Sequence, residues 1–207
     1  MTKDDKLSWI YSSKNKEELA ERYDEWAQSY DKDLEEDYGY QIPRLMAETL
    51  SRFATRDSRV LDAGAGTGLV GQTLGEEGYE DLVALDISGE MLNLAREKGV
   101  YKEIHQMDLG ETLDFPDDSF DAVVCAGVLT FSHAPAKSLY ELARVTRPGG
   151  HVLYSLRDDA FESMGIGAVN SGLELAGKWK LLEKQGHQSF KLKEPDVIHH
   201  IWVYEVL

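Results

Sequence analysis

The sequence predicts an α/β fold: a seven-stranded, mostly parallel sheet with helices on both faces, an antiparallel edge strand and an N-terminal helical cap. Short apolar runs alternate with amphipathic stretches from residue 59 to residue 156, which is typical of parallel strands joined by right-handed crossovers. Beyond them, residues 179–190 and 199–206 are expected to form two more strands, separated by a turn near Pro195. This last pair is expected to be antiparallel, at the sheet edge.

Apolar residues recur at helical spacing in two segments before the sheet, 15–30 and 41–53, which predicts two helices that cap it. The first residues carry no such pattern and are expected to be mobile. A further helix is expected over 160–176. The 207 residues are therefore interpreted as one domain with three parts: an N-terminal cap over 1–56, a ligand-binding core over 57–157, and a C-terminal helix with edge strands over 158–207.

The first strand of the core ends in an acid that is followed by three alternating glycines, in the run VLDAGAGTG at 60–68. Glycine has no Cβ, so its backbone can approach a ligand closely or turn with a positive φ. Apolar residues at helical spacing follow, so the loop should open a helix whose free N–H groups face that ligand. Strand, loop and helix together predict the first unit of a nucleotide-binding sheet.

The register of these glycines bears on which nucleotide binds. A dinucleotide fingerprint can be drawn through Gly66, Gly68 and Gly71, but its first glycine should directly end the strand. Instead Asp62 stands there, where a pyrophosphate needs positive potential, and an acid suits a cationic ligand better. The arrangement Asp62-x-Gly64-x-Gly66-x-Gly68 resembles motif I of the class I S-adenosylmethionine-dependent methyltransferases, which have a Rossmann-like sheet.

Further segments extend the resemblance from residue 58 to residue 156. Asp86 ends the second apolar run, where an acid can accept both ribose hydroxyls of either an NAD or an S-adenosylmethionine ligand. In the family, an acid at the position of Asp108, in a segment expected to close the third strand, bonds the adenine amino group. The fourth strand leads into Ala126 and Gly127, and an Arg-Pro-Gly-Gly turn precedes the fifth.

The resemblance implies a set of cofactor-binding residues from the glycine loop, the ends of the next strands and the N-terminal cap. They are Asp62, Ala63, Gly64, Gly66, Gly68, Asp86, Ile87, Met91, Met107, Asp108, Leu109, Ala126, Gly127, Trp26 and Tyr30. For three of them a purely structural role is the alternative. Trp26 and Tyr30 lie four residues apart on one helix face, so both could simply pack against the core, and Asp108 could shape a turn.

The segment before the sheet narrows the resemblance. The run YDEWAQSYDKD at 23–33 is similar to the opening of the small methyltransferase-like proteins typified by the Williams–Beuren region methyltransferase. The similarity covers roughly three quarters of the chain and fades after residue 160. That subgroup is joined by its cofactor domain, so it implies no particular substrate.

One titratable residue is a candidate for catalysis. His133 follows the fourth strand, at the carboxyl edge where open α/β sheets present their ligands. A base there could take a proton from an attacking oxygen or nitrogen; the alternative is a surface histidine near the start of the next helix. Methyl transfer by in-line displacement needs no covalent enzyme intermediate, and positioning can supply up to ~7–11 kcal/mol of the rate.

Charge and composition exclude several partners. The formal net charge is −16, from 38 acids against 22 Lys plus Arg, so neither nucleic acid nor an anionic membrane is an expected partner. No apolar run approaches the roughly 18 residues of a membrane span, and the N-terminus lacks a secretory signal. The single cysteine, Cys125, cannot form an internal disulfide and is interpreted as a core residue. We expect a soluble, cytoplasmic protein.

Two segments resemble metal-binding motifs but lack the arrangement that a metal ion requires. His199 and His200 are adjacent on an expected strand, so their side chains point to opposite faces. A calcium loop counted from Asp31 would need glycine sixth and a carboxylate twelfth, where the chain has Glu36 and Ile42. No metal is therefore expected.

Three functions are consistent with the sequence. The first is an S-adenosylmethionine-dependent methyltransferase that acts on an O, N or S atom of a small-molecule acceptor and releases S-adenosylhomocysteine. The second is an NAD(P)-linked oxidoreductase on a similar sheet. The third is a protein that binds S-adenosylmethionine without catalysis. The acceptor and the oligomeric state stay open.

Overall fold

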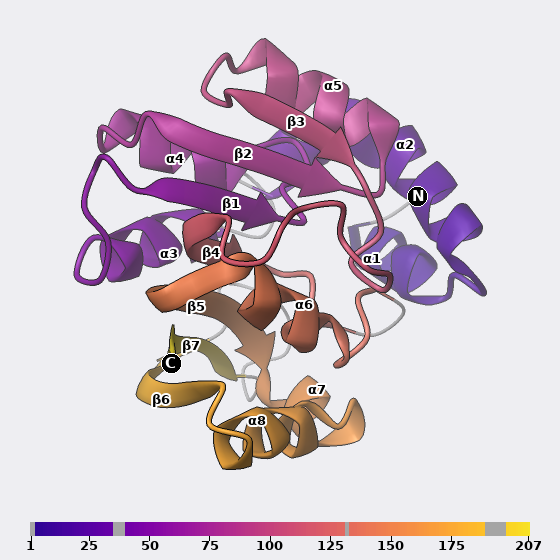
Figure 1. Ribbon diagram of the computed structural model, residues 1–207. Helices are drawn as coiled ribbons and strands as arrows, with labels where there is room; N and C mark the ends of the chain where they lie inside the picture. Colours follow the sequence, from indigo (N-terminus) through magenta and orange to yellow (C-terminus); the bar gives the residue numbers. More distant parts are fainter. Residues whose placement is uncertain (1–2, 35–39, 131–132, 189–197) are drawn as a thin grey trace.

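The computed structural model describes residues 3–34, 40–130, 133–188 and 198–207, and shows the predicted α/β architecture (Figure 1). One seven-stranded sheet has the order β3-β2-β1-β4-β5-β7-β6, parallel except that β7 runs antiparallel to both β5 and β6. The strands are β1 (Arg59–Ala63), β2 (Asp81–Asp86), β3 (Glu103–Gln106), β4 (Phe120–Cys125), β5 (Thr146–Arg157), β6 (Trp179–Gln188) and β7 (Ile198–Val206). The helices are α1 (Lys3–Tyr11), α2 (Lys16–Lys32), α3 (Ile42–Leu50), α4 (Leu69–Glu76), α5 (Gly89–Glu97), α6 (Ser138–Val145), α7 (Asp158–Ser163) and α8 (Ile166–Leu175).

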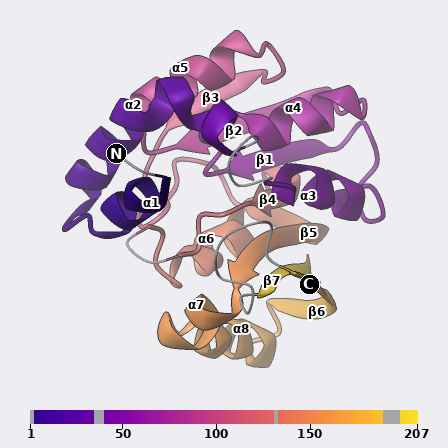
Figure 2. The same cartoon turned by 180° about the vertical axis from the view of Figure 1, so that it is seen from behind.

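Helices cover both faces of the sheet, as a parallel sheet requires. Two successive residues of β1 show this, because their side chains point to opposite faces. Leu61 packs in the core under α6, α7 and α8, whereas Val60 packs in the core under α3 and α4. Figure 2 shows α3 and α4 in front of the strands when the molecule is seen from behind. The side chain of Asp62 therefore points to the same face as Val60.

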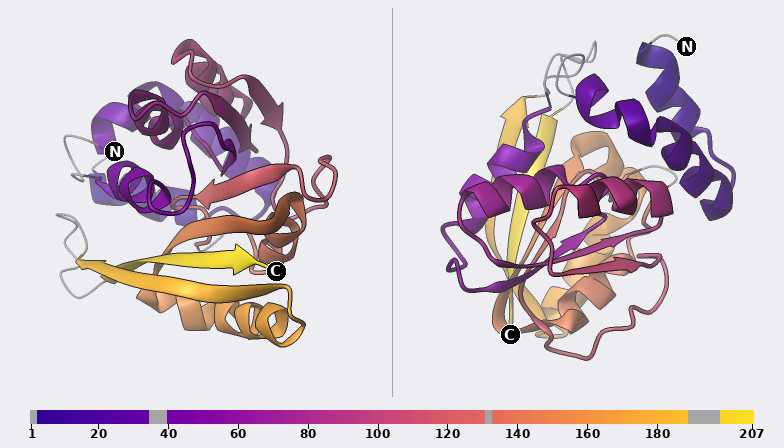
Figure 3. Two further views of the ribbon diagram at one scale, coloured as in Figure 1. Left: turned by 60° about the vertical axis from the view of Figure 1, so that its left-hand side comes forward. Right: turned by 90° about the horizontal axis from the view of Figure 1, so that it is seen from above.

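Within the N-terminal cap, α3 packs on one face of the sheet, whereas α1 and α2 lie beyond the carboxyl ends of the central strands. Figure 1 shows α1 and α2 on the side toward which β1 and β2 point, and Figure 3 shows the same from above. Asn15 caps α2 by accepting from Glu18 N at 2.8 Å. Two aspartates fasten α2 to α5 and the glycine loop: Asp24 accepts from the Ser88 hydroxyl at the start of α5, and Asp31 accepts from Thr67 and pairs with Lys98 at 2.7 Å.

The structure differs from the sequence predictions in four elements. The Arg-Pro-Gly-Gly segment expected to precede the fifth strand lies inside β5, which begins at Thr146. The start of the chain forms helix α1 instead of a mobile segment, because Ile10 buries its side chain against α2. The helix expected over 160–176 is broken into α7 and α8 by Gly165, whose φ of +73° lies in the left-handed region. The third strand ends at Gln106, so Met107, Asp108 and Leu109 follow it in a loop.

Residues 189–190, the end of the strand expected over 179–190, and the turn expected near Pro195 lie outside the described residues. In the part of the chain that the structure describes, no helix has the length and apolarity needed to cross a bilayer.

Candidate active site

The glycine loop follows β1 with three left-handed residues. Gly64, Gly66 and Gly68 have φ angles of +82°, +55° and +88°. A Cβ on Gly64 would lie 2.2 Å from a methyl of Val128, whereas a Cβ on Gly66 would meet no atom within 4 Å. Gly64 is therefore required for packing, while Gly66 leaves open space at the surface of a cavity.

Asp86 is held in place by the backbone around it. One carboxylate oxygen accepts from Gly66 N at 2.8 Å and the other accepts from Ser88 N at 2.9 Å. Ser88 in turn caps α5 by accepting from Met91 N at 3.0 Å. Burial raises the pKa of Asp86 above its usual range. Each oxygen keeps a lone pair for a ligand, so the carboxylate is oriented and only partly satisfied.

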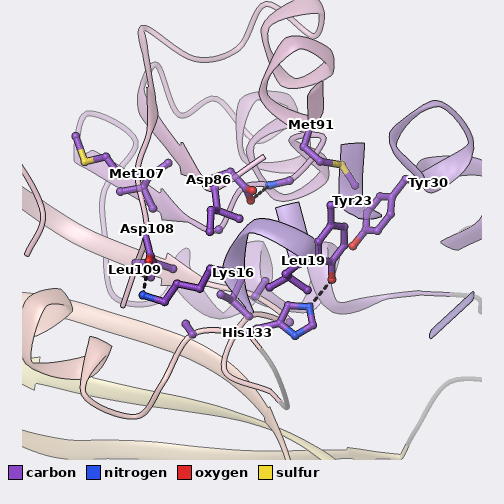
Figure 4. A pocket seen from close by; sticks show the side chains of 18 residues that line it. Lys16, Leu19, Tyr23, Tyr30, Asp86, Met91, Met107, Asp108, Leu109 and His133 are labelled. Atoms are coloured by element: carbon purple, nitrogen blue, oxygen red, sulfur yellow. Dashed lines mark hydrogen bonds and ion pairs between the residues drawn. The ribbon is translucent and has the colours of Figure 1, made fainter. Parts of the chain in front are cut away.

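A cavity lies between the glycine loop, Asp86 and the cap (Figure 4). Twelve of the predicted site residues line it: Tyr30, Gly64, Gly66, Asp86, Ile87, Met91, Met107, Asp108, Leu109, Ala126, Gly127 and His133. Six lining residues were not predicted: Lys16, Leu19, Tyr23, Leu85, Val128 and Ala134. Leu19 and Tyr23 could have been found, because they share a helix face with Trp26 and Tyr30 at spacings of three and four.

Four predicted residues do not line this cavity: Asp62, Ala63, Gly68 and Trp26. Asp62 lies beneath the glycine loop, 1% exposed, where its Oδ2 accepts from the hydroxyl of Tyr101 at 2.6 Å. Its Oδ1 has no hydrogen-bond partner, and burial raises its pKa to about 7. The sequence places this acid at the strand end, but the pleat turns its side chain toward the face that α4 covers.

Lys16 reaches from the first turn of α2 across to the loop after β3. Its Nζ lies 2.5 Å from Asp108 and 3.0 Å from Glu111, and Figure 4 shows the pair with Asp108 at the rim of the cavity. These contacts raise the pKa of Lys16. No local sequence signal connects residues so far apart, which is why the sequence did not reveal this contact.

A second cavity adjoins the first. It is lined by Tyr11, Tyr23, Trp26, Tyr30, Leu34, Tyr40, Gly127, Leu129, Thr130, His133, Ser155, Leu156, Arg157 and His199. Four residues line both cavities: Tyr23, Tyr30, Gly127 and His133. Trp26 thus contacts this second space, and its indole also packs in the core of the cap.

His133 and Tyr23 meet where the two cavities join. Nε2 of His133 lies 2.5 Å from the hydroxyl of Tyr23, and the dashed line in Figure 4 marks this hydrogen bond. Burial raises the pKa of Tyr23 well above its ordinary value, so the phenol stays protonated. The hydroxyl of Tyr23 and the imidazole to which it is hydrogen-bonded thus both lie at the boundary between the two cavities.

The first cavity suits a nucleoside that carries a cation better than a dinucleotide. Two carboxylates, those of Asp86 and Asp108, lie among apolar side chains such as Ile87 and Met91. Among the described residues that line this cavity, Lys16 is the only lysine or arginine, and two carboxylates already pair with it. A pyrophosphate would thus find little positive charge beyond the helix terminus. The described residues contain no cluster suited to a metal ion.

Comparison with known proteins agrees with this geometry. Residues 61–154 match the family model described as a methyltransferase domain. Human methyltransferase-like protein 27 is 34% identical over 165 residues, which is 76% of this chain and 66% of that protein. Phosphatidylethanolamine N-methyltransferase of Cereibacter sphaeroides is 41% identical over 114 residues, 51% of this chain and 53% of that protein. The chain thus spans about half to two thirds of the length of these two relatives.

Solved structures share the fold at low identity. The cyclase SpnF has a TM-score of 0.71 at 16% identity and covers 94% of this chain and 97% of its own. A TehB-like methyltransferase from Corynebacterium glutamicum has a TM-score of 0.63 at 18% identity, with 90% of this chain and 99% of its own covered. With the family match and the glycine loop, cavity and strand order described above, the chain belongs to the class I S-adenosylmethionine-dependent methyltransferases.

Proposed function

We propose that the protein moves a methyl group from S-adenosylmethionine to an oxygen, nitrogen or sulfur atom of a small-molecule acceptor by in-line displacement. The observation that carries this proposal is the meeting of two cavities at Tyr23, Tyr30, Gly127 and His133. One cavity has the groups for a nucleoside, and the other is a separate space for an acceptor. We assign the protein to the subgroup of small methyltransferase-like proteins, on its similarity to human methyltransferase-like protein 27.

The lining of the first cavity supports specific roles for the donor. Asp86 is oriented to accept the two ribose hydroxyls, and Asp108 to accept from the adenine amino group. Ile87, Met91 and Leu109 would cover the adenine faces. The open backbone at Gly66 would hold the amino-acid portion. Asp62 would attract the cationic end of the donor from beneath the loop without touching it.

S-adenosylmethionine supplies, when bound, a methyl group on a sulfonium, and the electron pair of the methyl–sulfur bond stays on sulfur when the methyl group is transferred. The chain's own residues supply position, a dry surrounding and a proton acceptor. Helix α2, fastened by Asp24 and Asp31, contributes Tyr23 and Tyr30 to the junction of the cavities and would shield it from water. His133 would act as the general base for acceptors that carry a proton on the attacking atom.

The net charge of −16 supports an acceptor other than nucleic acid. The second cavity, whose wall on the side of the cap is aromatic, supports a small molecule as the acceptor.

The test of this proposal is ligand binding followed by transfer. S-adenosylhomocysteine at a hundredfold excess over its dissociation constant should stabilise the protein by about 2.7 kcal/mol, measured as a rise in Tm, and NADH should not. Stabilisation by NADH alone would favour the oxidoreductase. If S-adenosylhomocysteine binds but labelled S-adenosylmethionine labels no member of a broad acceptor panel, that result favours a binding protein.

A further inference from the structure

The second cavity has a chemical character of its own. Its wall toward the cap is aromatic and comes from the end of α1 and from successive turns of α2: Tyr11, Tyr23, Trp26 and Tyr30, with Tyr40 nearby. The rings of Trp26 and Tyr30 meet edge to face at 4.8 Å, and those of Tyr23 and Tyr30 at 6.2 Å. Such a wall favours a planar apolar ring, which can pack edge to face or offset against it.

Among the described residues that line this cavity there is no aspartate or glutamate. Its titratable groups other than tyrosines are His133, Arg157 and His199, and Arg157 donates two hydrogen bonds to Asp159, at 3.0 and 2.8 Å. An ammonium placed there would lose its hydration without gaining a carboxylate partner from any of these described residues. A neutral acceptor that becomes anionic as it loses a proton suits this lining better.

Hydroxyl groups provide the remaining polar contacts. Thr130 is 7% exposed, and its Oγ1 has no hydrogen-bond partner although it belongs to a residue that lines the cavity. The hydroxyl oxygen of Ser155 accepts from Gly127 N at 2.8 Å, which leaves its own proton for another partner. A buried hydroxyl without a partner costs about 1–3 kcal/mol, so a polar atom of a ligand is the expected partner of Thr130.

From these observations we infer that the second cavity takes a phenol, a planar apolar ring with an ionisable hydroxyl, and that Tyr23 relays the proton of that hydroxyl to His133. The inference rests on the proposed function and names its acceptor class. The hydroxyl of the phenol donates to Oη of Tyr23, and the proton of Tyr23 moves to Nε2 of His133. The proton of the phenol replaces it on Tyr23. The electron pair left on the phenol oxygen forms the new bond to the methyl carbon while the bond from that carbon to sulfur breaks, and the pair of the broken bond stays on sulfur. The imidazolium later releases its proton to water.

Tyr23 is therefore more than a packing residue in this scheme. Burial keeps its phenol protonated, because its pKa lies well above the ordinary value, so it passes a proton on without carrying a lasting charge. Figure 4 shows its hydroxyl directed at the imidazole of His133. The same geometry would do little for an amine that is already deprotonated.

The experiment uses the full chain saturated with S-adenosylhomocysteine and three nitrobenzenes that differ only in the substituent at position 4: 4-nitrophenol, 4-nitroanisole and 4-nitrobenzylamine. Quenching of tryptophan fluorescence reports binding. We expect 4-nitrophenol to bind about tenfold more tightly than each of the other two, since a tenfold difference corresponds to ~1.4 kcal/mol, about one buried hydrogen bond. The absorbance of 4-nitrophenol should show ionisation at a lower pH in the complex than in buffer.

Two substitutions separate the relay from packing. Tyr23→Phe should lower the affinity for 4-nitrophenol to that for 4-nitroanisole and leave the affinity for 4-nitroanisole unchanged. It should also abolish the change in the pH at which bound 4-nitrophenol ionises. Tyr140→Phe, on the exposed side of α6, is the matched control and should change neither.

Equal or tighter binding of 4-nitrobenzylamine overturns the inference, as does an equal loss of 4-nitroanisole binding in Tyr23→Phe. Either result leaves the proposed function standing if S-adenosylhomocysteine still raises the Tm. Failure of S-adenosylhomocysteine to bind overturns the proposed function and the inference together.

Discussion

The hydroxyl of Tyr101 donates a 2.6 Å hydrogen bond to Asp62 in the space that Gly71 leaves open under the glycine loop. A Cβ at position 71 would lie 2.1 Å from that hydroxyl oxygen. Three segments thus depend on one another here: the acid that ends β1, a glycine of α4, and a tyrosine from the connection between α5 and β3. The third glycine of the apparent dinucleotide fingerprint therefore has a packing role in this protein.

Asp62 should make stability depend on pH. Burial raises its pKa to about 7 in the folded protein, against about 3.9 in an unfolded chain. The folded state therefore holds the extra proton between these values, and the stability that Asp62 contributes below about pH 4 is lost as the pH rises toward 7. Asp62→Asn should gain stability relative to the native protein across that interval, measured by urea unfolding at several pH values. A difference that stays constant with pH would contradict the shift.

Gly71→Ala should destabilise the protein by about 1–3 kcal/mol, because the new methyl group overlaps the hydroxyl of Tyr101. Gly172→Ala is the matched control in α8, where the nearest atom would lie at an ordinary 3.5 Å. There the substitution should stabilise the helix by about 0.5–1 kcal/mol. Thermal unfolding of both variants measures the contrast, and equal effects would show that Tyr101 does not fill this space.

Asp86→Ala should weaken binding of S-adenosylhomocysteine by at least about a hundredfold, because each of the two hydrogen bonds from the ribose to this charged acceptor contributes about 1.5–3 kcal/mol. Asp86 also holds Gly66 N and Ser88 N, so a purely structural loss must be separated from loss of ribose contacts. The 2′-deoxy analogue does this in calorimetric titrations. The native protein should prefer the ribose form, and the variant should not discriminate. Asp114→Ala, at an exposed position, serves as the control.

Lys16→Gln should speed the release of S-adenosylhomocysteine severalfold with little change in overall stability. The ammonium of Lys16 joins α2 to Asp108 at 2.5 Å across the rim of the cavity, but the side chain is 41% exposed. Exposed ion pairs contribute at most about 1 kcal/mol to stability. Stopped-flow displacement measures release, and salt should accelerate it in the native protein more than in the variant. Lys178→Gln, far from the cap, should behave as the native protein.

Local sequence determined the order of strands and helices, the left-handed glycine loop, the cap of α5 at Ser88 and the place of Asp86 at the end of β2. These features depend on hydrophobic periodicity and on residues within a few positions of one another. The same patterns indicated His133 at the carboxyl edge, where it lines both cavities. Its proposed role as a base stays a prediction.

The tertiary structure alone decided which side chains meet. It turned Asp62 under the loop toward Tyr101, brought Lys16 to Asp108, and set Tyr23 against His133 across 110 residues of sequence. The physical reason is that such contacts depend on how the cap docks on the sheet and on which face of a strand a side chain points to. Neither is encoded in the spacing of neighbouring residues, so the second cavity becomes visible only once the chain is folded.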